Sequence, residues 1–343
     1  MIVNRVKKNI KIKFQNGLSF NDFKTEVLDI NYLDEYFNFI ESEQPDFIIF
    51  GPYGNEIPEK SSDYIRVGYF CENIRPDFSC CEWAFGIPRE TDINHPRYKR
   101  IQWHGLEPKS LLKNLTDNEI DRIISLKNKF CNFLYSNPVF YREEFFKQLS
   151  KYKKVDAPGK SMNNMLSIDK IYNGSFWDRK RAFLESYKFT IAFESYSYPG
   201  YQTEKLYDAM QVNSIPIYCG DPYIGEVFNT NSFVNVPDHI LVCRSTLVKL
   251  AELTGQQTFN DYRPQFYKSP FYRIKRKTKT LIRNQKMNIQ FNNLNFSDII
   301  EQIITIDKNE DLYIQYLKQP WFKQNQLPQN TNNRETWLKI FNS

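Results

Sequence analysis

One segment in the second half of this chain constrains its fold more than any other, because it has the pattern of a strand, a loop, a helix and a second strand. An apolar, β-rich run over 187–195 leads into a loop of Tyr, Ser, Pro and Gly. Thr203-Glu204-Lys205 is typical of a helix start, and Ile215-Pro216-Ile217-Tyr218 predicts the next strand before a Gly220-Asp221-Pro222 turn. Helix N-termini in such βαβ units attract anions, so the segment predicts a phosphate site.

The length and composition favour two folded domains. A chain of 343 residues is long for one core, and 41% hydrophobic residues with 16% aromatics exclude global disorder. No apolar run approaches the ~20 residues that span a bilayer, and the basic start lacks the apolar core of a signal peptide. The six cysteines form no Cys-x-x-Cys pair, so we expect reduced, structural thiols and favour a cytosolic location.

The remaining apolar runs predict an α/β organisation throughout. We expect strands at 46–51, 64–70, 82–86, 100–103 and 130–135, of which 64–70 has an alternating pattern. Residues 117–129 have helical spacing, with Thr116 or Asp117 as the cap. We therefore predict domains at 1–128 and 129–310, a basic insertion at about 240–293 within the second domain, and a helical tail at 311–343.

The positive charge of the chain is local. Residues 262–297 contain no acidic residue, and their nine basic residues exceed the formal net charge of +6 of the whole chain. These residues are Arg263, Lys268, Arg273, Lys275, Arg276, Lys277, Lys279, Arg283 and Lys286, interleaved with Phe266, Tyr267, Phe271 and Tyr272. Two interpretations stay open: a solvated surface loop, or a surface that contacts an anionic membrane or an acidic lipid-linked acceptor.

Three blocks of the sequence carry a family resemblance. Phe193-Glu194-Ser195, Tyr201-Gln202-Thr203-Glu204-Lys205 and the strand and turn that follow resemble the donor-binding signature of the α-1,3/4-fucosyltransferases, glycosyltransferase family ten. Glu72-Asn73-Ile74-Arg75-Pro76-Asp77-Phe78 is similar to the amino-terminal motif of that family, and Ser136-Asn137-Pro138 with Arg142 is similar to the element that precedes its donor domain. The blocks occur in the family's order over roughly 45–236, more than half of the chain.

The resemblance implies a fold and a reaction. The fold is GT-B, α/β, with two Rossmann-like domains facing each other across a cleft: an N-terminal acceptor domain and a C-terminal domain that binds the GDP-sugar. The reaction is an inverting transfer of L-fucose from GDP-fucose to a glycan hydroxyl, most of all O3 of N-acetylglucosamine, by an enzyme of the hexosyltransferase class. Animal members have a Golgi anchor, and the lack of one here suggests a soluble, bacterial-type member.

An inverting transfer needs a carboxylate to take the acceptor's proton and positive charge to stabilise the departing diphosphate. The resemblance implies Glu72 as the general base, Arg142 and Lys205 on the diphosphate, and Glu204 on the ribose. The rest of the donor pocket that it implies is Ser136, Asn137, Ser195 and Tyr201, with Lys160 and Glu194 as secondary candidates. Without the resemblance, Glu72 would be interpreted as a solvated or Arg-paired carboxylate and Thr203-Glu204-Lys205 as an ordinary helix start.

Ser195 is a departure from the family pattern. It stands where the family has Asn, and a hydroxyl makes fewer hydrogen bonds over a shorter reach than an amide. This substitution leaves the identity of the donor sugar open.

The resemblance also bears on cofactors and partners. The chain has no Asp-x-Asp, and His95, His104 and His239 lack ligand spacing, so we expect no essential metal and no cofactor besides the donor GDP-fucose. We expect an acceptor glycan of a glycoprotein or a lipopolysaccharide, with a lipid-linked form among the candidates, and a cytoplasmic protein that contacts the inner face of an anionic membrane. Nucleic acid is not expected as a partner.

Three alternatives remain at this stage. The first is a related transferase with another GDP-sugar or acceptor. The second is a catalytically silent glycan-binding relative, although the combination of Glu72, Arg142, Glu204 and Lys205 argues against it. The third is a nucleic-acid-binding protein that uses the basic aromatic segment 263–286. The sequence does not show which glycan is the acceptor, whether fucose is attached to its 3- or 4-hydroxyl, or what the oligomeric state is.

Overall fold

The computed structural model of the chain describes residues 7–103, 106–239, 246–291, 296–328 and 332–343. His104 and Cys243, as well as the side chains of His239, Phe266 and Tyr267, lie outside this description.

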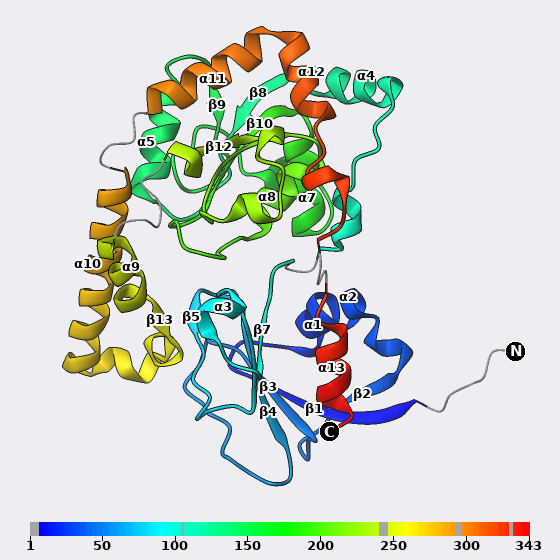
Figure 1. Cartoon of the computed structure of the whole chain (residues 1–343), viewed down its shortest axis with the longest axis vertical. Helices are drawn as coiled ribbons and strands as arrows, with labels where there is room; N and C mark the ends of the chain where they lie inside the picture. Colours follow the sequence, from blue (N-terminus) through cyan, green and yellow to red (C-terminus); the bar gives the residue numbers. More distant parts are fainter. Residues whose placement is uncertain (1–6, 104–105, 240–245, 292–295, 329–331) are drawn as a thin grey trace, which may run out of the picture. The chain divides into compact units, whose positions relative to one another are not determined.

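The chain forms two compact units, each with its own parallel sheet (Figure 1). Unit 1 comprises the described residues of Met1–Glu107, Lys249–Lys286 and Gln329–Ser343, and unit 2 those of Pro108–Val248 and Met287–Pro328. Residues 249–286 of the basic segment thus lie in unit 1, whereas the sequence suggested an insertion in the second domain.

Unit 1 is built on a six-stranded sheet in which all neighbouring strands are parallel. In the order β2-β1-β3-β4-β6-β7, its strands are Phe37–Glu41, Lys8–Gln15, Phe47–Phe50, Ile65–Phe70, Trp83–Gly86 and Tyr98–Arg100. Its helices are α1 (Phe20–Phe23), a π-helical turn (Lys24–Leu28), α2 (Asp29–Asn31), α3 (Glu90–Ile93) and α13 (Arg334–Phe341); α9 (Thr246–Gly255) and α10 (Pro270–Phe291) lie mostly in this unit. Short 3₁₀ turns occur at Leu33–Glu35, Phe259–Tyr262 and Pro264–Lys268.

Strands β3, β4, β6 and β7 of unit 1 correspond to predicted apolar runs, with two corrections, whereas no strand was predicted at the positions of β1 and β2. Strand β4 is not half-exposed as its alternating pattern suggested, because all its residues except Ile65 are buried. Arg66 tolerates this burial because its guanidinium forms an ion pair of 2.7 Å with Glu82. The strand predicted at 100–103 instead ends at Arg100 in β7. Continuous burial is typical of central strands in parallel sheets, which are covered on both faces.

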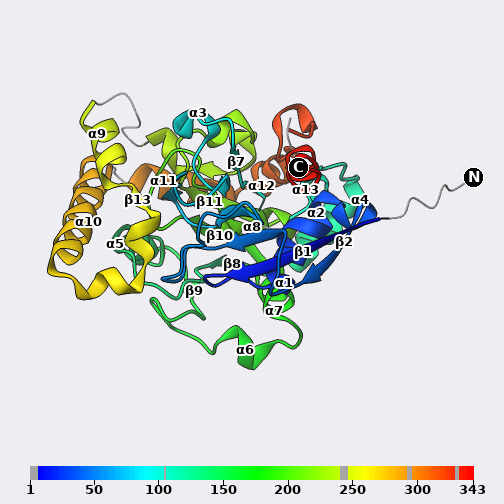
Figure 2. The same cartoon turned by 90° about the horizontal axis from the view of Figure 1, so that it is seen from below.

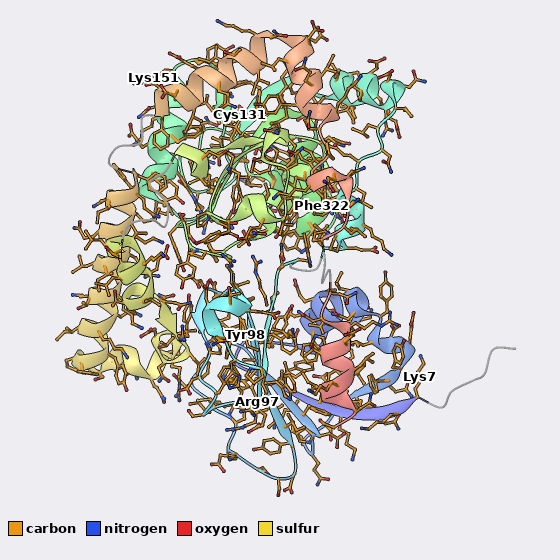
Figure 3. All side chains as sticks on the ribbon, in the orientation of Figure 1. Lys7, Arg97, Tyr98, Cys131, Lys151 and Phe322 are labelled. Carbon is orange, nitrogen blue, oxygen red and sulfur yellow. The ribbon has the colours of Figure 1, made fainter. Side chains whose placement is uncertain are left out.

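Aromatic side chains from distant parts of the chain cover the sheet of unit 1. Trp337 of α13 stacks on Phe85 of β6 with ring centroids 4.1 Å apart. Elsewhere on the sheet, Phe259 packs against Phe50 and Phe70 at 5.6 and 5.5 Å. Tyr98, labelled in Figure 3, is 2% exposed in the same interior. Full burial of such side chains stabilises the fold by about 1.5–3 kcal/mol each.

The basic segment is folded onto unit 1 rather than looped into solvent. Strand β13 (Gln257–Thr258) pairs in parallel with β5 (Ile74–Arg75), the strand directly after Glu72. Helices α9 and α10 lie side by side in Figures 1 and 2. Gly255 permits this contact, since a Cβ there would lie 3.1 Å from Arg283 Cγ of α10. Among the described residues, no helix has the length and apolarity that crossing a membrane requires.

Unit 2 is built on a five-stranded sheet, again parallel throughout. In the order β12-β11-β10-β8-β9, its strands are Val234–Asn235, Ile215–Cys219, Tyr187–Phe193, Lys129–Asn132 and Val155–Asp156. Its helices are α4 (Asp117–Leu126), α5 (Phe140–Leu149), α6 (Ile168–Ile171), α7 (Phe176–Glu185), α8 (Glu204–Gln211), α11 (Phe296–Lys308) and α12 (Glu310–Lys318). Its 3₁₀ turns are Pro108–Leu111, Ile224–Glu226, Thr230–Ser232, Val236–His239 and Lys323–Asn325.

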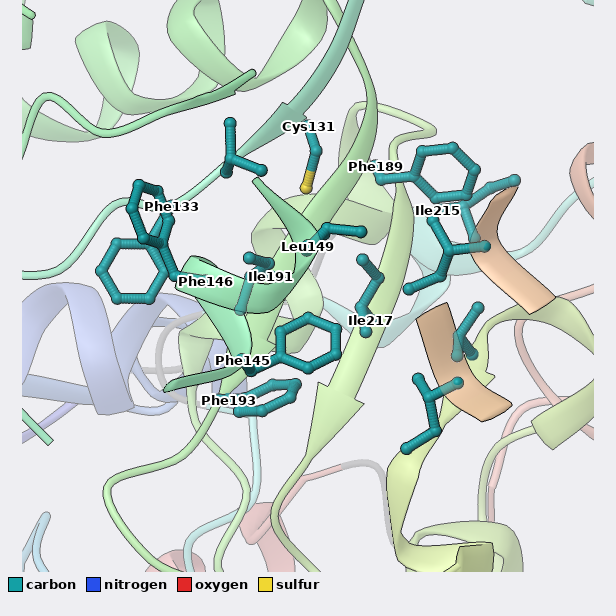
Figure 4. Close-up of a cluster of buried hydrophobic side chains, with 14 of the residues drawn as sticks. Cys131, Phe133, Phe145, Phe146, Leu149, Phe189, Ile191, Phe193, Ile215 and Ile217 are labelled. Carbon is teal, nitrogen blue, oxygen red and sulfur yellow. The ribbon is translucent and has the colours of Figure 1, made fainter. Parts of the chain in front are cut away.

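The core of unit 2 lies between its sheet and the helices on it. Figure 4 shows apolar side chains of β8, β10 and β11 meeting those of α5. Cys131, Phe145, Phe189 and Ile217 have no exposed surface there. The βαβ segment predicted from the sequence is confirmed as β10, α8 and β11, and helix α4 starts at a capping box formed by Thr116 and Glu119. The five described cysteines are free thiols, and all but Cys71 are buried.

Candidate active site

A cavity of about 520 Å³ in unit 2 lies beyond the carboxyl ends of strands β8 and β9. This is the place where parallel α/β sheets bind ligands, and its volume suits a ligand of nucleotide-sugar size. Six of the nine donor residues predicted from the sequence line it: Ser136, Asn137, Arg142, Lys160, Glu204 and Lys205. The structure therefore brings together, in one cavity, residues from loops after β8 and β9, from α5 and from α8.

A glycine lets two of these loops come together. Gly159, which precedes Lys160, packs so closely on the chain after β8 that a Cβ would lie 2.2 Å from the carbonyl oxygen of Tyr135. The same carbonyl accepts a hydrogen bond of 3.0 Å from the amide of Ser161. Only glycine permits this approach, and the approach forms one edge of the cavity.

The sequence suggested that Glu194 lines the donor pocket. In the structure, Glu194 is not a lining residue and instead holds Thr203 in place behind the cavity wall. Its carboxylate follows β10, is 0% exposed and accepts hydrogen bonds of 2.8 Å from both the amide and the hydroxyl of Thr203. Burial raises the pKa of Glu194, and the nearby ammonium of Lys205, 3.4 Å away, opposes that rise. Because the hydroxyl of Thr203 points to Glu194, this N-cap residue accepts no capping hydrogen bond from a backbone amide in the first turn of α8.

Lys205 is held as a cation at the wall of the cavity. Its Nζ lies 2.9 Å from the Thr203 hydroxyl and 3.3 Å from a carboxylate oxygen of Glu204. Burial favours a lower pKa for Lys205, but the carboxylates of Glu194 and Glu204 outweigh it and raise the pKa above the ordinary value. The ammonium is therefore protonated at neutral pH.

Arg142 brings a second positive charge to the cavity. It is 3% exposed, its Nε donates a hydrogen bond of 3.1 Å to the carbonyl of Glu194, and its guanidinium lies 4.3 Å from the ring centroid of Tyr135. Its buried Nη2 has no hydrogen-bond partner within the described part of the chain. Leaving a charged donor unpaired is costly, so this nitrogen is suited to an anionic oxygen in the cavity.

Ser195 and Tyr201 are not among the lining residues of the cavity, although the sequence had placed both in the donor pocket. The two hydroxyls are 3.4 Å apart, and Tyr201 stacks on Tyr196 with centroids 5.2 Å apart. Asp221 of the predicted Gly-Asp-Pro turn ties down the loop that carries them. It accepts hydrogen bonds of 2.9 Å from the Gly200 amide and 2.6 Å from the Gln202 side chain.

Lys180 and Tyr135 are among the lining residues of this cavity that sequence reasoning missed. Lys180 of α7 lines it, forms an ion pair with the buried Asp208 and lies 3.8 Å from Glu204. Nothing in the spacing of α7 distinguishes Lys180 from a solvated helix lysine. Tyr135 also lines the cavity, and its hydroxyl bridges the Ile191 carbonyl and the Phe193 amide at 2.7 Å each. Its position in an apolar run marked it only as a strand residue.

The predicted base, Glu72, lies in unit 1 shortly after the carboxyl end of β4. The hydroxyl of Tyr53 donates a hydrogen bond of 2.5 Å to Glu72 Oε1. Burial first and the Glu72 carboxylate second raise the pKa of Tyr53, so Tyr53 stays a proton donor. Sequence reasoning missed Tyr53, although it follows Gly51-Pro52 after the neighbouring strand β3. Neighbouring parallel strands have their carboxyl ends at the same edge of a sheet. The position of Tyr53 shortly after β3 could therefore have indicated that it lies near Glu72, which follows β4.

The motif of Glu72 is anchored by residues 256–258, which lie just before the basic residues of 263–286. Asn73 is 1% exposed, and its side-chain oxygen accepts a hydrogen bond of 3.3 Å from Gln256. The pairing of β13 with β5 fixes the next two residues of the motif. The segment 249–286 thus has a structural role at the candidate base that its composition did not reveal.

Two parallel α/β units of this kind define a class of glycosyltransferase fold. The crystal structure of α1,3-fucosyltransferase with GDP-fucose aligns with a TM-score of 0.62 at 21% identity, covering 99% of this chain and 92% of that chain. This likeness shows the GT-B fold that the resemblance implied. Residues 124–280 match the family model for the C-terminal domain of glycosyltransferase family 10 (fucosyltransferase), and residues 12–105 match that for the N-terminal domain of α-(1,3)-fucosyltransferase FucT. The chain belongs to the family 10 fucosyltransferases.

Curated relatives agree with this assignment over parts of their length. A putative fucosyltransferase of Acanthamoeba polyphaga mimivirus is 38% identical over 119 residues, which are 34% of this chain and 20% of the relative. The α-(1,3)-fucosyltransferase FucT of Helicobacter pylori is 33% identical over 205 residues, 50% of this chain and 41% of the relative. The chain therefore matches less than half the length of these two relatives.

Proposed function

We propose that this protein transfers L-fucose from GDP-fucose to a hydroxyl of an acceptor glycan, with O3 of N-acetylglucosamine as the acceptor position. The observation that carries the proposal is the cavity of unit 2, which combines Arg142, Lys205 and Glu204. Two further observations support it: the family assignment, and the shared fold with an α1,3-fucosyltransferase whose crystal structure contains GDP-fucose.

The chemistry of the cavity walls suits a nucleoside diphosphate. The unpartnered Nη2 of Arg142 and the ammonium of Lys205 would bind diphosphate oxygens, and Lys160 would add a third positive charge. Glu204 at the start of α8 is partly exposed and would accept hydrogen bonds from the ribose hydroxyls. The first turn of α8, which Thr203 does not cap, adds the partial positive charge of a helix N-terminus.

In the proposed reaction, Glu72 takes the proton of the acceptor hydroxyl. The electron pair of that oxygen forms the new bond to the anomeric carbon, and the bond to the phosphate oxygen breaks with inversion. GDP leaves with the negative charge, which Arg142 and Lys205 stabilise. Tyr53 would hold the Glu72 carboxylate in one orientation while its other oxygen faces the acceptor.

Because Arg142 and Lys205 bring protein cations to the cavity, we expect the reaction to proceed without an essential metal. Chelation with EDTA should leave turnover unchanged, and addition of Mg²⁺ or Mn²⁺ should not raise it more than about twofold. Loss of turnover on chelation, restored by one of these ions, would contradict this part of the proposal.

The main test follows GDP release and product mass with GDP-fucose and N-acetyllactosamine. We expect GDP release that depends on the acceptor, a product heavier by one deoxyhexose and an α-1,3 linkage in its NMR spectrum. GDP-mannose is the matched donor, with the same nucleotide and a different sugar, and should react far more slowly. Faster transfer from GDP-mannose would overturn the donor, and GDP release that does not need the acceptor would overturn the transfer.

We further propose that α10 places the enzyme at the cytoplasmic face of an anionic membrane, where it would reach lipid-linked acceptors. Phe271, Ile274 and Leu281 of α10 are 62–69% exposed and recur on one face of the helix. Arg273, Lys275 and Lys277 are exposed beside them. Two other lysines of α10 are not available to a membrane, because each forms an ion pair within the protein. Lys286 pairs with Glu252 at 2.9 Å, and Lys279 pairs with Asp261. Such an apolar face with basic flanks suits a lipid surface.

Sedimentation with anionic and neutral liposomes tests this placement. The wild type should sediment with anionic vesicles at low salt and be released at high salt, since salt screens surface charges. Changing Ile274 and Leu281 to Ser should abolish sedimentation without changing turnover on a soluble acceptor. Sedimentation that persists in this variant, or binding to an oligonucleotide but not to vesicles, would refute the membrane contact.

A further inference from the structure

Unit 2 contains a second cavity, of about 310 Å³, that shares no lining residue with the donor cavity. It is formed by the end of β12, the 3₁₀ turn before it, and helices α11 and α12. Nothing in the reaction proposed above uses it. Its size lies at the lower end of the range for small-molecule sites, which suits one or two sugar rings better than a nucleotide.

Side-chain amides dominate the wall of this cavity. They come from Asn231, Asn235, Gln302, Gln315 and Gln319. Each amide offers both a donor and an acceptor, the combination that matches the hydroxyls of a sugar. Within the described part of the chain, the lining residues include no Lys or Arg, so the wall lacks the cations that a phosphate requires.

Hydrogen bonds inside the wall hold some of these amides in place. The Gln302 amide donates a bond of 2.9 Å to the hydroxyl of Tyr316. The side-chain oxygen of Gln319 accepts a bond of 3.2 Å from Asn229, which leaves the NH₂ group of Gln319 for another acceptor. Tyr316 and Phe233 add aromatic carbon to the lining, which suits the apolar face of a pyranose ring.

Asn235 indicates independently that this cavity takes a ligand. Its side chain is 6% exposed and lines the cavity, yet its Oδ1 has no hydrogen-bond partner among the described residues. A buried amide oxygen without a partner is uncommon in folded proteins and destabilising. A hydroxyl donor that reaches this oxygen would satisfy it.

We propose that this cavity binds a sugar unit of a neutral oligosaccharide, as a second carbohydrate site apart from the donor cavity. The neutral amide wall, the aromatic surface and the unpartnered Asn235 oxygen define this ligand class. Asp238, the one carboxylate among the described lining residues, would accept hydrogen bonds from sugar hydroxyls and would repel anions. The site needs no turnover, so it can be tested apart from the transfer reaction.

The test is ligand-observed NMR with N-acetyllactosamine and with chitotetraose, on protein saturated with GDP to occupy the donor cavity. We expect the wild type to bind one of the two at up to about 10 mM, and about 10 mM inorganic phosphate not to displace it. Gln315→Ala, at an exposed helix position, should weaken binding at this cavity about threefold to tenfold, and the double variant with Asn235→Ala should lose it. Binding at the acceptor site of the proposed reaction should be the same in the wild type and both variants. Gln285→Ala, a second exposed helix glutamine outside the cavity, is the matched control and should bind like the wild type.

The GDP affinity of each variant shows whether it is folded, and it should equal that of the wild type. Failure of both oligosaccharides to bind would overturn the second site, as would equal binding by the wild type and the Gln315→Ala variant, or displacement by phosphate. If Asn235→Ala fails to fold, Gln315→Ala alone decides the result. None of these outcomes bears on GDP binding, so this inference and the transfer reaction fail or survive separately.

Discussion

The donor cavity of unit 2 and the surroundings of Glu72 in unit 1 are built in contrasting ways. Arg142, which lines the donor cavity, is 3% exposed, and Glu194 behind the cavity is 0% exposed. Each contacts several fixed partners. Glu72 is half-buried and has Tyr53, itself half-exposed, as its side-chain hydrogen-bond partner. The contrast suggests that the nucleotide site is formed before the donor binds, whereas the base is left accessible to a bulky acceptor.

The largest expected effect is at the base. Glu72→Gln keeps the shape of the side chain and one oxygen that can accept the hydrogen bond of Tyr53, but it cannot take a proton. We expect kcat to fall by ~10²–10⁴-fold while the Kd for GDP stays within about twofold, because the proposed base acts on the proton of the acceptor and has no proposed role in holding the nucleotide. Steady-state kinetics and calorimetry measure the two quantities. Glu59→Gln, at an exposed position of the same unit, is the control and should behave as the wild type.

Removing a cation from the donor cavity should have the next largest effect. Lys205→Ala and Arg142→Ala should each weaken GDP binding by about 1.5–3 kcal/mol, since each removes a charge-assisted contact. Guanosine, which has no phosphate, should bind almost unchanged. Lys151→Ala, an exposed lysine labelled in Figure 3, serves as the control. If guanosine and GDP lost the same affinity, the two residues would support the fold instead of binding phosphate.

A glycine substitution tests how rigid the edge of the donor cavity is. Gly159→Ala places a Cβ within 2.2 Å of the Tyr135 carbonyl oxygen, so we expect a loss of about 1–3 kcal/mol in the free energy of unfolding. GDP affinity should fall as well, because the two loops must separate. Gly225→Ala is the control, since its Cβ would make only an ordinary contact of 3.4 Å with Thr230. Thermal unfolding with and without GDP separates the two effects, and an unchanged Gly159→Ala variant would show that the edge is adaptable.

The smallest expected effect concerns the far ends of α7 and α8. Lys127 donates hydrogen bonds of 2.6 Å to the carbonyls of Glu185 and Val212, and burial lowers its pKa to about 7. The unfolded chain then binds more protons than the folded one between pH 7 and the ordinary lysine pKa of about 10.4. Stability from this group therefore rises with pH across that window and is lost as the pH falls toward 7. Lys127→Met should flatten the slope of unfolding free energy between pH 7 and 9 by up to about 1.4 kcal/mol per pH unit.

Denaturant titrations at several pH values measure that slope. Lys151→Met, at an exposed position, should keep the slope of the wild type. A Lys127→Met variant with the same slope as the wild type would show that Lys127 is charged in the folded state at neutral pH.

Much of the fold was predictable because parallel sheets need long apolar runs. The strands β3, β4, β6, β10 and β11 and the start of α8 all follow patterns that neighbouring residues define. Arg142, Glu204 and Lys205 were identified by their place in a known order of motifs, and the structure brings them to one cavity. Local patterns and motif order were sufficient for these features.

The rest depends on contacts between residues far apart in the sequence. Composition marked Lys279 and Lys286 as surface charges, but their carboxylate partners Asp261 and Glu252 lie on other elements and turn them inward. Similarly, the motif placed Glu194 with the donor, whereas its burial behind Thr203 makes it a support. Side-chain direction of this kind follows from tertiary packing, which the sequence pattern does not show.

The central claim is that donor binding and proton transfer depend on different residues. It is tested most directly by measuring GDP affinity and turnover for two variants. Glu72→Gln and Lys205→Ala should each be assayed for GDP affinity by calorimetry and for turnover at saturating GDP-fucose. The account predicts that Glu72→Gln loses turnover with unchanged GDP affinity, and that Lys205→Ala loses GDP affinity with a smaller loss of turnover. Loss of GDP affinity in Glu72→Gln, with turnover retained at saturating donor, would contradict it.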